Sequence, residues 1–305
     1  MIPVTFSSDK KAVVFPVHDM RILTVNFSND GTRLLTGAED GLIRIWSFPE
    51  IAFQGEFLVH QGWIYEAHFL PGDSTVISAG RDERVIIHQI RKREIISSIS
   101  AHEGAARSVA VSSEGKKAVS SGFDGSLIMW DLLDTTISKS WPAHSLAVCD
   151  VDISPEGTRM VSGSRDKKVK VWSLPEGSLM AQLEGHDNEI KSVRFSPDGS
   201  MIATAGFDKT VRLWNANQFV SLEVFKGHSG NIHSLAFHPL RPFLVSGGDD
   251  ALLHVWDLQN MVLHSVYELP TGTRSIAFSP DGRYLVAAKA NGCIRIINQE
   301  ELKIQ

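Results

Sequence analysis

Residues 185–228 read GHDNEI KSVRFSPDGS MIATAGFDKT VRLWNANQFV SLEVFKGH. Four short runs rich in apolar and β-branched residues, at 193–195, 201–205, 211–214 and 222–225, are separated by turn-forming segments such as SPDG. No helical period of useful length is present, so the pattern predicts four short β-strands joined by tight turns. A sheet of this size cannot bury both faces alone, and it therefore requires similar sheets beside it.

The same pattern recurs with a period of 42 residues, and four residue types keep one register over six units. Histidine occupies His18, His60, His102, His144, His186 and His228. A hydroxyl residue follows at Thr36, Ser78, Ser120, Ser162, Thr204 and Ser246. Aspartate occupies Asp40, Asp82, Asp124, Asp166, Asp208 and Asp250. Tryptophan occupies Trp46, Trp130, Trp172, Trp214 and Trp256, and His88 stands at the remaining tryptophan position.

A seventh, degenerate unit follows with a deletion of one residue. Its SPDG at 279–282 matches the SPDG at 196–199, whereas Ala287 takes the hydroxyl position and Ile297 the tryptophan position. Seven units of about 42 residues account for nearly all of the 305 residues. We therefore expect one domain over residues 1–305 rather than two domains. Radial stacking of seven four-stranded antiparallel sheets predicts an all-β, seven-bladed β-propeller.

The two ends of the chain predict how the ring closes. Residues 11–15 precede His18 as a fourth strand without a sheet of its own, and residues 293–298 form a third strand without an obvious successor. We expect the N-terminal strand to complete the seventh sheet. Removing it would leave an unpaired strand edge, which favours aggregation.

The repeat resembles the WD-repeat (tryptophan–aspartate repeat) β-propeller family over residues 11–298. The resemblance rests on Gly185-His186, the SPDG at 196–199, Trp256-Asp257 and the 42-residue spacing. The sequence departs from the family pattern at several units. Only two units keep the Gly-His pair, and only two of the tryptophans are followed by aspartate.

Ser, His and Asp in every unit would suggest hydrolase chemistry, but an active-site triad is needed only once. We interpret the repeated set as structural: Asp accepts from one imidazole nitrogen, the hydroxyl donates to the other, and the hydroxyl oxygen accepts the indole N–H. The resemblance implies the same network. Complete sets are His18-Thr36-Asp40-Trp46, His102-Ser120-Asp124-Trp130, His144-Ser162-Asp166-Trp172, His186-Thr204-Asp208-Trp214 and His228-Ser246-Asp250-Trp256.

Several other classes of function find no support in the sequence. No phosphate-binding glycine loop is present, two cysteines make no disulfide framework, and His68, His88 and His254 lack metal-ligand spacing. We therefore expect no enzyme activity, no cofactor and no metal. A net charge of −5 makes nucleic acid an unlikely partner, and no segment suits a membrane. Without a signal peptide, a cytoplasmic location is expected, with the nucleus as the alternative.

The predicted His–Asp contact brings the loop after each His and the turn before each Asp to one rim. Three positions per unit face it: the third and fifth after His and the residue before Asp. Six of these residues are Lys or Arg and three are Asp or Glu, a net charge of +3. The resemblance implies that such positions contact partners on the top face. Our candidate binding residues are Arg21, Trp63, Tyr65, Arg81, Arg107, Phe123, Arg165, Lys191, Phe207, His233 and Arg274.

Aromatic and arginine residues together are typical of binding hot spots. The sequence therefore favours a non-catalytic scaffold that binds protein partners on its rim, including acidic or phosphorylated segments. We expect a monomeric propeller within a larger complex. One alternative is an enzyme or small-molecule-binding propeller that uses the central channel, which requires a non-repeated cluster of carboxylates or histidines near the axis. A second alternative is RNA or DNA binding through the basic rim.

Overall fold

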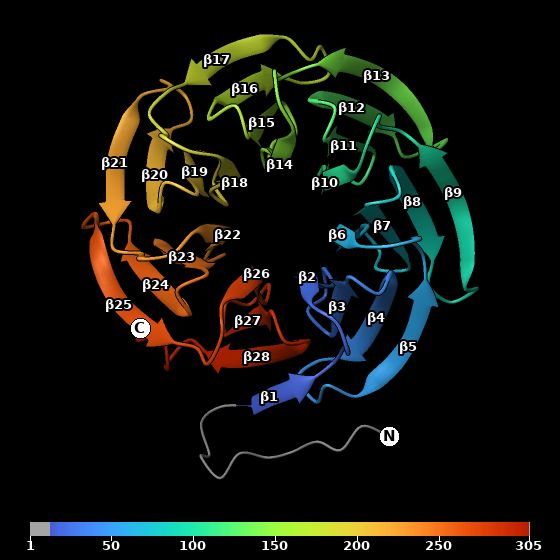
Figure 1. Ribbon diagram of the computed structural model, residues 1–305, viewed down its shortest axis with the longest axis horizontal. Helices are drawn as coiled ribbons and strands as arrows, with labels where there is room; N and C mark the ends of the chain where they lie inside the picture. Colours follow the sequence, from blue (N-terminus) through green and yellow to red (C-terminus); the bar gives the residue numbers. More distant parts are fainter. Residues whose placement is uncertain (1–12, 305) are drawn as a thin grey trace.

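Residues 13–304 are described by a computed structural model. Seven four-stranded antiparallel sheets are arranged radially around a central channel (Figure 1). We call these sheets blades 1 to 7, in the chain order of their innermost strands. The predicted seven-bladed β-propeller is confirmed.

In blades 1 to 6, the first strand lines the channel and the fourth forms the outer edge (Figure 1). Blade 1 contains β2 (Ile22–Phe27), β3 (Arg33–Ala38), β4 (Leu42–Ser47) and β5 (Phe53–Leu58). Blade 2 contains β6 (Ile64–Phe69), β7 (Thr75–Gly80), β8 (Arg84–Gln89) and β9 (Glu94–Ser100). Blade 3 contains β10 (Ala106–Val111), β11 (Lys117–Gly122), β12 (Ser126–Asp131) and β13 (Thr136–Pro142).

The second half of the ring repeats this plan. Blade 4 contains β14 (Val148–Ile153), β15 (Arg159–Ser164), β16 (Val169–Ser173) and β17 (Leu179–Leu183). Blade 5 contains β18 (Ile190–Phe195), β19 (Met201–Gly206), β20 (Thr210–Asn215) and β21 (Ser221–Lys226). Blade 6 contains β22 (Ile232–Phe237), β23 (Phe243–Gly248), β24 (Leu252–Asp257) and β25 (Val262–Glu268). Blade 7 contains β26 (Thr273–Phe278), β27 (Tyr284–Lys289), β28 (Cys293–Asn298) and β1 (Val13–Pro16).

The N-terminal strand closes the ring, as the sequence predicted. Strand β1 pairs antiparallel with β28, with Phe15 opposite Ile294 and Pro16 opposite Cys293. Residues 11 and 12 of the predicted strand lie outside the described residues. Blade 7 is therefore built from both ends of the chain.

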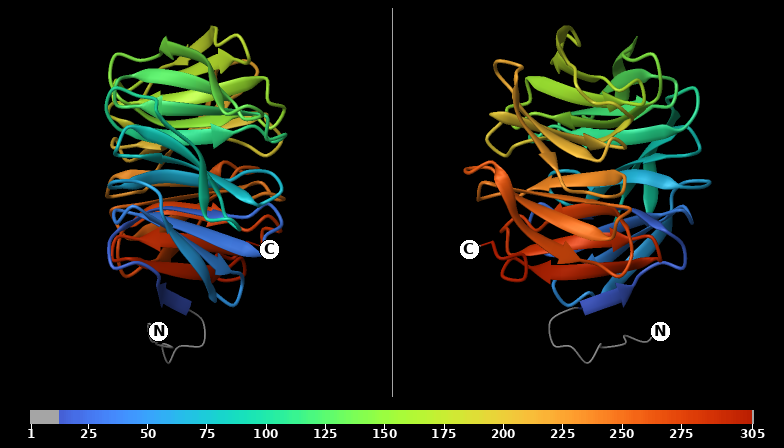
Figure 2. Two further views of the ribbon diagram at one scale, coloured as in Figure 1. Left: turned by 90° about the vertical axis from the view of Figure 1, so that its right-hand side faces the viewer. Right: turned by 60° about the vertical axis from the view of Figure 1, so that its left-hand side comes forward.

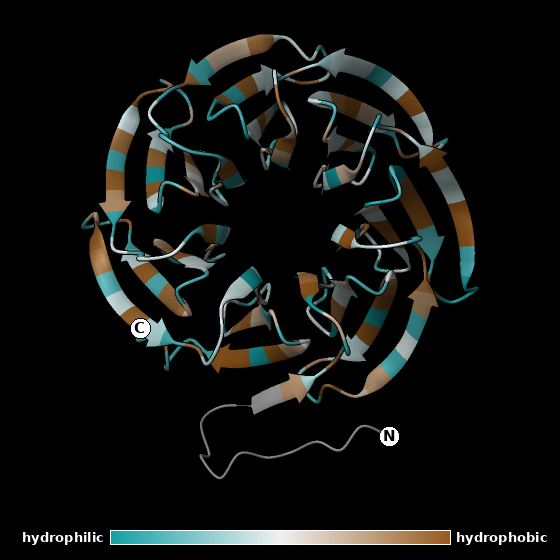
Figure 3. Ribbon diagram, in the orientation of Figure 1, coloured by the Kyte–Doolittle hydropathy of each residue, from teal (hydrophilic) through white to brown (hydrophobic). Residues whose placement is uncertain are grey.

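The hydrophobic core lies between neighbouring blades. Ala203 and Leu213 of blade 5, for example, belong to one buried cluster with Leu235 and Trp256 of blade 6. Side views show the blades stacked around the ring, with connecting loops on both faces (Figure 2). Outer strands such as β9 carry both apolar and polar residues along their length (Figure 3). Each blade thus buries its faces against its neighbours, as short sheets require.

Candidate partner-binding rim and central channel

The top rim is organised by one backbone hydrogen bond that recurs in every blade. The residue before the Asp position donates its N–H to the carbonyl of the third residue after the His position, at 2.8–3.3 Å. In blade 2, for example, Arg81 N–H donates to the Trp63 carbonyl at 2.8 Å. The side chains at these two positions are therefore held beside each other, as the sequence argument expected.

The hydrogen bonds expected of the five complete sets are all present. The His Nδ1 atoms lie 2.7–3.3 Å from the Asp carboxylates, and the His Nε2 atoms lie 2.7–2.9 Å from the Ser or Thr hydroxyls. Each indole N–H donates to the same hydroxyl at 2.9–3.1 Å. All these histidines are buried. The sets thus satisfy polar groups that would otherwise be buried without partners.

The ionisation of these groups follows from their contacts. Although burial opposes ionisation, the hydrogen bond from His186 lowers the pKa of Asp208 to about 2. Burial lowers the pKa of His102, His144 and His228, and the Asp partners only partly oppose it. A neutral imidazole between a carboxylate and a hydroxyl therefore fits the network.

Two blades depart from the full set. In blade 2, His60 contacts Asp82 at 2.7 Å and Ser78 at 2.8 Å, while His88 occupies the indole position against Phe57. In blade 7 the strand register places Leu269, Ala287, Asn291 and Ile297 at the four positions. Leu269, Ala287 and Ile297 belong to one buried apolar cluster. Blade 7 therefore replaces the polar network with apolar packing.

On the rim, the aromatic candidates of blade 2 are covered by arginines. The Arg81 guanidinium lies over Trp63 with 4.9 Å to the ring centroid, and the Arg107 guanidinium lies over Tyr65 at 4.6 Å. Trp63 and Tyr65 meet edge to face with centroids 5.9 Å apart. These contacts hold long, flexible arginine side chains in place, which reduces the entropy that a partner's binding must remove.

The aromatic contacts continue into blade 3. The ring centroids of Tyr65 and Phe123 are 6.1 Å apart, and the Arg165 guanidinium lies 4.8 Å from the Phe123 centroid. Phe123 keeps 37% of its surface exposed although it is a large apolar residue. We call Trp63, Tyr65, Arg81, Arg107, Phe123 and Arg165 the arginine–aromatic band.

The remaining candidates form a second group at blades 5 to 7. The Lys191 ammonium lies 4.5 Å from the Phe207 centroid, and Phe207 meets His233 edge to face. His233 contacts Asp249 and Arg274. Burial and the neighbouring Arg274 charge lower the pKa of His233 to about 4, so His233 is neutral at pH 7. Arg21, on blade 1, pairs with Glu39 at 3.6 Å.

Acidic neighbours already neutralise part of the rim's positive charge. Glu189 lies 2.8 Å from Lys191 and 3.5 Å from Arg165. Asp249 lies 3.2 Å from Arg274. Among the rim residues of the described chain, Arg81 and Arg107 form no ion pair within 4.0 Å. The net positive charge of the rim is therefore concentrated in the band.

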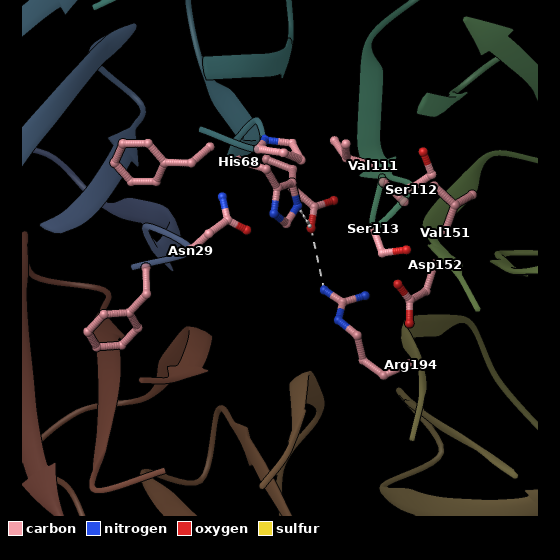
Figure 4. A pocket seen from close by; sticks show the side chains of 13 residues that line it. Asn29, His68, Val111, Ser112, Ser113, Val151, Asp152 and Arg194 are labelled. Atoms are coloured by element: carbon pink, nitrogen blue, oxygen red, sulfur yellow. Dashed lines mark hydrogen bonds and ion pairs between the residues drawn. The ribbon is translucent and has the colours of Figure 1, made fainter. Parts of the chain in front are cut away.

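The central channel contains a non-repeated charged cluster that sequence reasoning missed. Arg194 on β18 of blade 5 donates to Asp150 at 2.6 Å and reaches Glu66 on β6 of blade 2 at 3.4 Å. Strands β6 and β18 lie on opposite sides of the channel, so this contact crosses it (Figures 1 and 4). His68 contacts Glu66 at 3.1 Å, and Asp152 faces the same space (Figure 4). This is the kind of non-repeated cluster that the central-channel alternative requires, and the sequence did not reveal it.

The residues of the cluster stand at the sixth position after His (Glu66 and Asp150) and at the eighth (His68, Asp152 and Arg194). A comparison of these two positions between units would have revealed the cluster. The sixth-position side chain accepts the N–H of the next blade's first strand at six of the seven junctions, as Ser234 does from Ile276 at 3.1 Å. Five blades have Ser or Thr there, whereas Glu66 and Asp150 are acids. The signal in the sequence was an acidic residue at the sixth position, where the other five blades have Ser or Thr.

The described residues offer no metal site and no membrane-crossing helix. Within residues 13–304, no group of three or more His, Cys, Asp or Glu side chains is arranged to hold a metal ion. Over the same residues, no helix has both the length and the apolar character needed to traverse a bilayer.

The ring of seven blades, together with the recurring His–hydroxyl–Asp–Trp sets, defines a β-propeller of the WD-repeat type. A family model described as IFT122 first beta-propeller matches residues 147–305, just over half of the chain. A second model, described as WD domain, G-beta repeat, matches residues 9–47 and 93–131. The chain therefore belongs to the WD-repeat β-propellers and, among them, to the family described as IFT122 first beta-propeller.

Individual relatives match shorter segments. The human (Homo sapiens) DDB1- and CUL4-associated factor 5 is 31% identical over 97 residues, which is 29% of this chain and 10% of that protein. Apoptotic protease-activating factor 1 of Danio rerio is 29% identical over 114 residues, which is 36% of this chain and 9% of that protein. The p21-activated protein kinase-interacting protein 1-like of Danio rerio is 30% identical over 101 residues, or 33% and 27%.

The matched segments thus span about a tenth to a quarter of the length of these relatives. WD-repeat propellers are in general non-catalytic and mediate protein–protein interactions. That general role agrees with the scaffold that the sequence favoured. This general role identifies neither the binding residues of this chain nor its partners.

Proposed function

We propose that this protein is a non-catalytic scaffold whose arginine–aromatic band binds an acidic segment of a protein partner. The observation that carries the proposal is that Arg81 and Arg107 are held over Trp63 and Tyr65 without forming ion pairs. Such arginines are positioned to bind carboxylate or phosphate groups in a bidentate manner. The adjacent aromatic rings provide apolar contact area at low entropic cost.

The band has the features of an interaction hot spot. Arg, Trp and Tyr are the residues that dominate binding energy in protein interfaces. A positive band on a chain with a net charge of −5 also favours encounter with an acidic partner. The names of two relatives describe association with, or interaction with, other proteins, which supports a scaffold role for this chain too. We propose a cytosolic location for the protein, with the nucleus as the alternative.

A paired substitution tests the proposal. Trp63→Ala with Arg107→Glu removes one ring and reverses one unpaired charge. We expect proteins that co-purify with the wild-type chain to be lost, by at least tenfold in quantitative mass spectrometry, while circular dichroism and the melting temperature show an intact fold. Binding of a purified partner segment should weaken as its acidic residues are replaced by Gln or Asn.

The matched control is Leu240→Ala with Arg91→Glu, which makes the same kind of change at exposed residues away from the rim. This control should retain the partners. Equal retention by both double variants would refute the band as the binding site. Partners that disappear on nuclease treatment, with binding that falls steeply with salt, would instead indicate nucleic acid.

A further inference from the structure

The lower end of the central channel holds a cavity of about 240 Å³. Asn29, Pro71 and Ser113, which line it, belong to the turns that follow the inner strands. Those turns lie at the opposite end of the blades from the rim. Ligand pockets for drug-sized molecules span about 300–1,000 Å³. This cavity is therefore of a size for a small head group on a short alkyl chain.

Both acidic and basic side chains line the cavity. Glu66, His68, Asp152 and Arg194 all contribute to its wall (Figure 4). Arg194 is already occupied, because it donates to Asp150, to Glu66 and to the Val193 carbonyl. Two of the three carboxyl groups of the cluster, those of Glu66 and Asp150, thus occupy its one guanidinium.

Asp152 is the carboxyl group of this cluster without a close cation. Its oxygens accept the Phe195 N–H at 2.7 Å and its neighbour Ile153's N–H at 3.0 Å. It forms no ion pair within 4.0 Å with any residue from 13 to 304. Burial raises the pKa of Asp152 to about 6, although the Arg194 charge opposes this. The carboxyl is thus mostly ionised at pH 7.5.

A partly buried carboxylate is stabilised by a cation that reaches it. An anionic ligand would instead meet the three carboxyl groups. Phe27, Phe69 and Val111 provide apolar and aromatic wall beside the charged groups. Aromatic faces attract organic cations as well.

We propose that this cavity binds a guanidinium or alkylammonium group, with Asp152 as its anionic partner. The group enters from the face opposite the rim. It is either the head of a free small molecule or the Arg or Lys side chain of a protein segment. The site is independent of the arginine–aromatic band, so it stands or falls separately from the proposed function.

Calorimetric titration of the full chain with n-butylguanidinium and n-butylammonium tests the proposal, and neutral n-butylurea serves as the control ligand. We expect saturable binding of at least one cation at pH 7.5 and none of the urea. Asp152→Asn should raise the dissociation constant at least tenfold. Asp187→Asn, at an exposed acid near the rim, should leave it unchanged.

A second measurement on the wild-type chain does not depend on a variant that folds. Lowering the pH from 7.5 to 5.0 should weaken butylguanidinium binding about tenfold, because Asp152 takes up a proton while the ligand stays charged. Glu66, Asp150, His68 and Arg194 are the other ionisable groups that face Asp152. Circular dichroism at both pH values checks that the fold is retained.

The source of the cation is decided by two peptides, acetyl-Gly-Gly-Arg-Gly-Gly-amide and its citrulline counterpart. Tighter binding of the Arg peptide than of butylguanidinium indicates a protein segment, whereas binding of the free cation alone indicates a small molecule. The proposal is overturned if neither cation nor the Arg peptide binds saturably, if n-butylurea binds as well, or if Asp152→Asn and low pH both leave binding unchanged.

Discussion

Blades 5 and 7 solve the same packing problem by different means. In blade 5, His186 joins Asp208 at 2.7 Å and Thr204 at 2.8 Å, and Trp214 donates to the same hydroxyl. In blade 7 three of the four corresponding positions hold apolar residues, Leu269, Ala287 and Ile297, which lie in one cluster with Leu302 and Ile304 of the C-terminal segment. A buried polar network and an apolar cluster are thus interchangeable when each is complete, because only half-satisfied polar groups carry a large cost.

The two blades also differ in how the chain builds them. Blade 5 is one continuous segment, β18 to β21, whereas blade 7 takes β1 from the beginning of the described chain. Joining strands that are far apart in sequence costs more chain entropy than joining neighbours. Blade 7 therefore depends on a contact that no local hairpin enforces.

The largest effect is expected from removing β1, which completes blade 7 by pairing with β28. A chain lacking residues 1–17 loses β1 and exposes the edge of β28, which favours pairing between molecules. We expect aggregation and loss of the cooperative melting transition, measured by light scattering and calorimetry. A chain lacking residues 1–10 keeps β1 and is the control. A soluble truncation that melts cooperatively would show that blade 7 does not need β1.

A smaller effect is expected from removing the Asp of a polar network, as in blade 5. Asp208→Ala should lower the free energy of unfolding by about 1–3 kcal/mol, because it leaves the His186 ring nitrogen without its partner. Asn291→Ala, at the same position of blade 7, should change it by less than about 0.5 kcal/mol. Urea unfolding of the two variants measures both values. Equal losses would contradict the distinction between the blades.

The smallest effect per residue is expected from pH. Burial lowers the pKa of His102, His144 and His228 in the folded state, so the unfolded chain protonates first as the pH falls through about 6.5. Each histidine therefore removes at most about 0.8 kcal/mol between pH 7.5 and 6.0. Blade 7 has no histidine between residues 270 and 298 to contribute.

Urea unfolding at the two pH values measures the sum of these contributions. Asp152 acts in the opposite direction, since its raised pKa of about 6 lets the folded state take up a proton first. Asp152→Asn removes that opposition and should steepen the loss. Stability that is equal or greater at pH 6.0 in both proteins would contradict the prediction.

The repeated features were predictable because each position of the repeat occurs in several units, so that its residue type can be compared between them. The 42-residue period indicated the blades, and the positions of His18, Thr36, Asp40 and Trp46 indicated one network that recurs. Features that occur once were harder to predict. Glu66 and Arg194 are 128 residues apart, and nothing in a single unit shows that they meet across the channel.

The sequence alone also predicted which residues face the rim, but it did not show which of them form ion pairs. It assigned Arg81, Arg107, Arg165 and Lys191 to one face, but ion pairs with Glu189 involve only the last two. Side-chain reach between neighbouring blades decides such pairs, and a period does not encode it.

The sequence by itself determined the number of blades, the closure of the ring and the loop positions that meet on the rim. These follow from spacing and from the need of short sheets to bury their faces. Only the tertiary structure decided which arginines are unpaired and where a charged contact crosses the channel. Those depend on distances between side chains of different blades, which folding sets only when the whole ring is assembled.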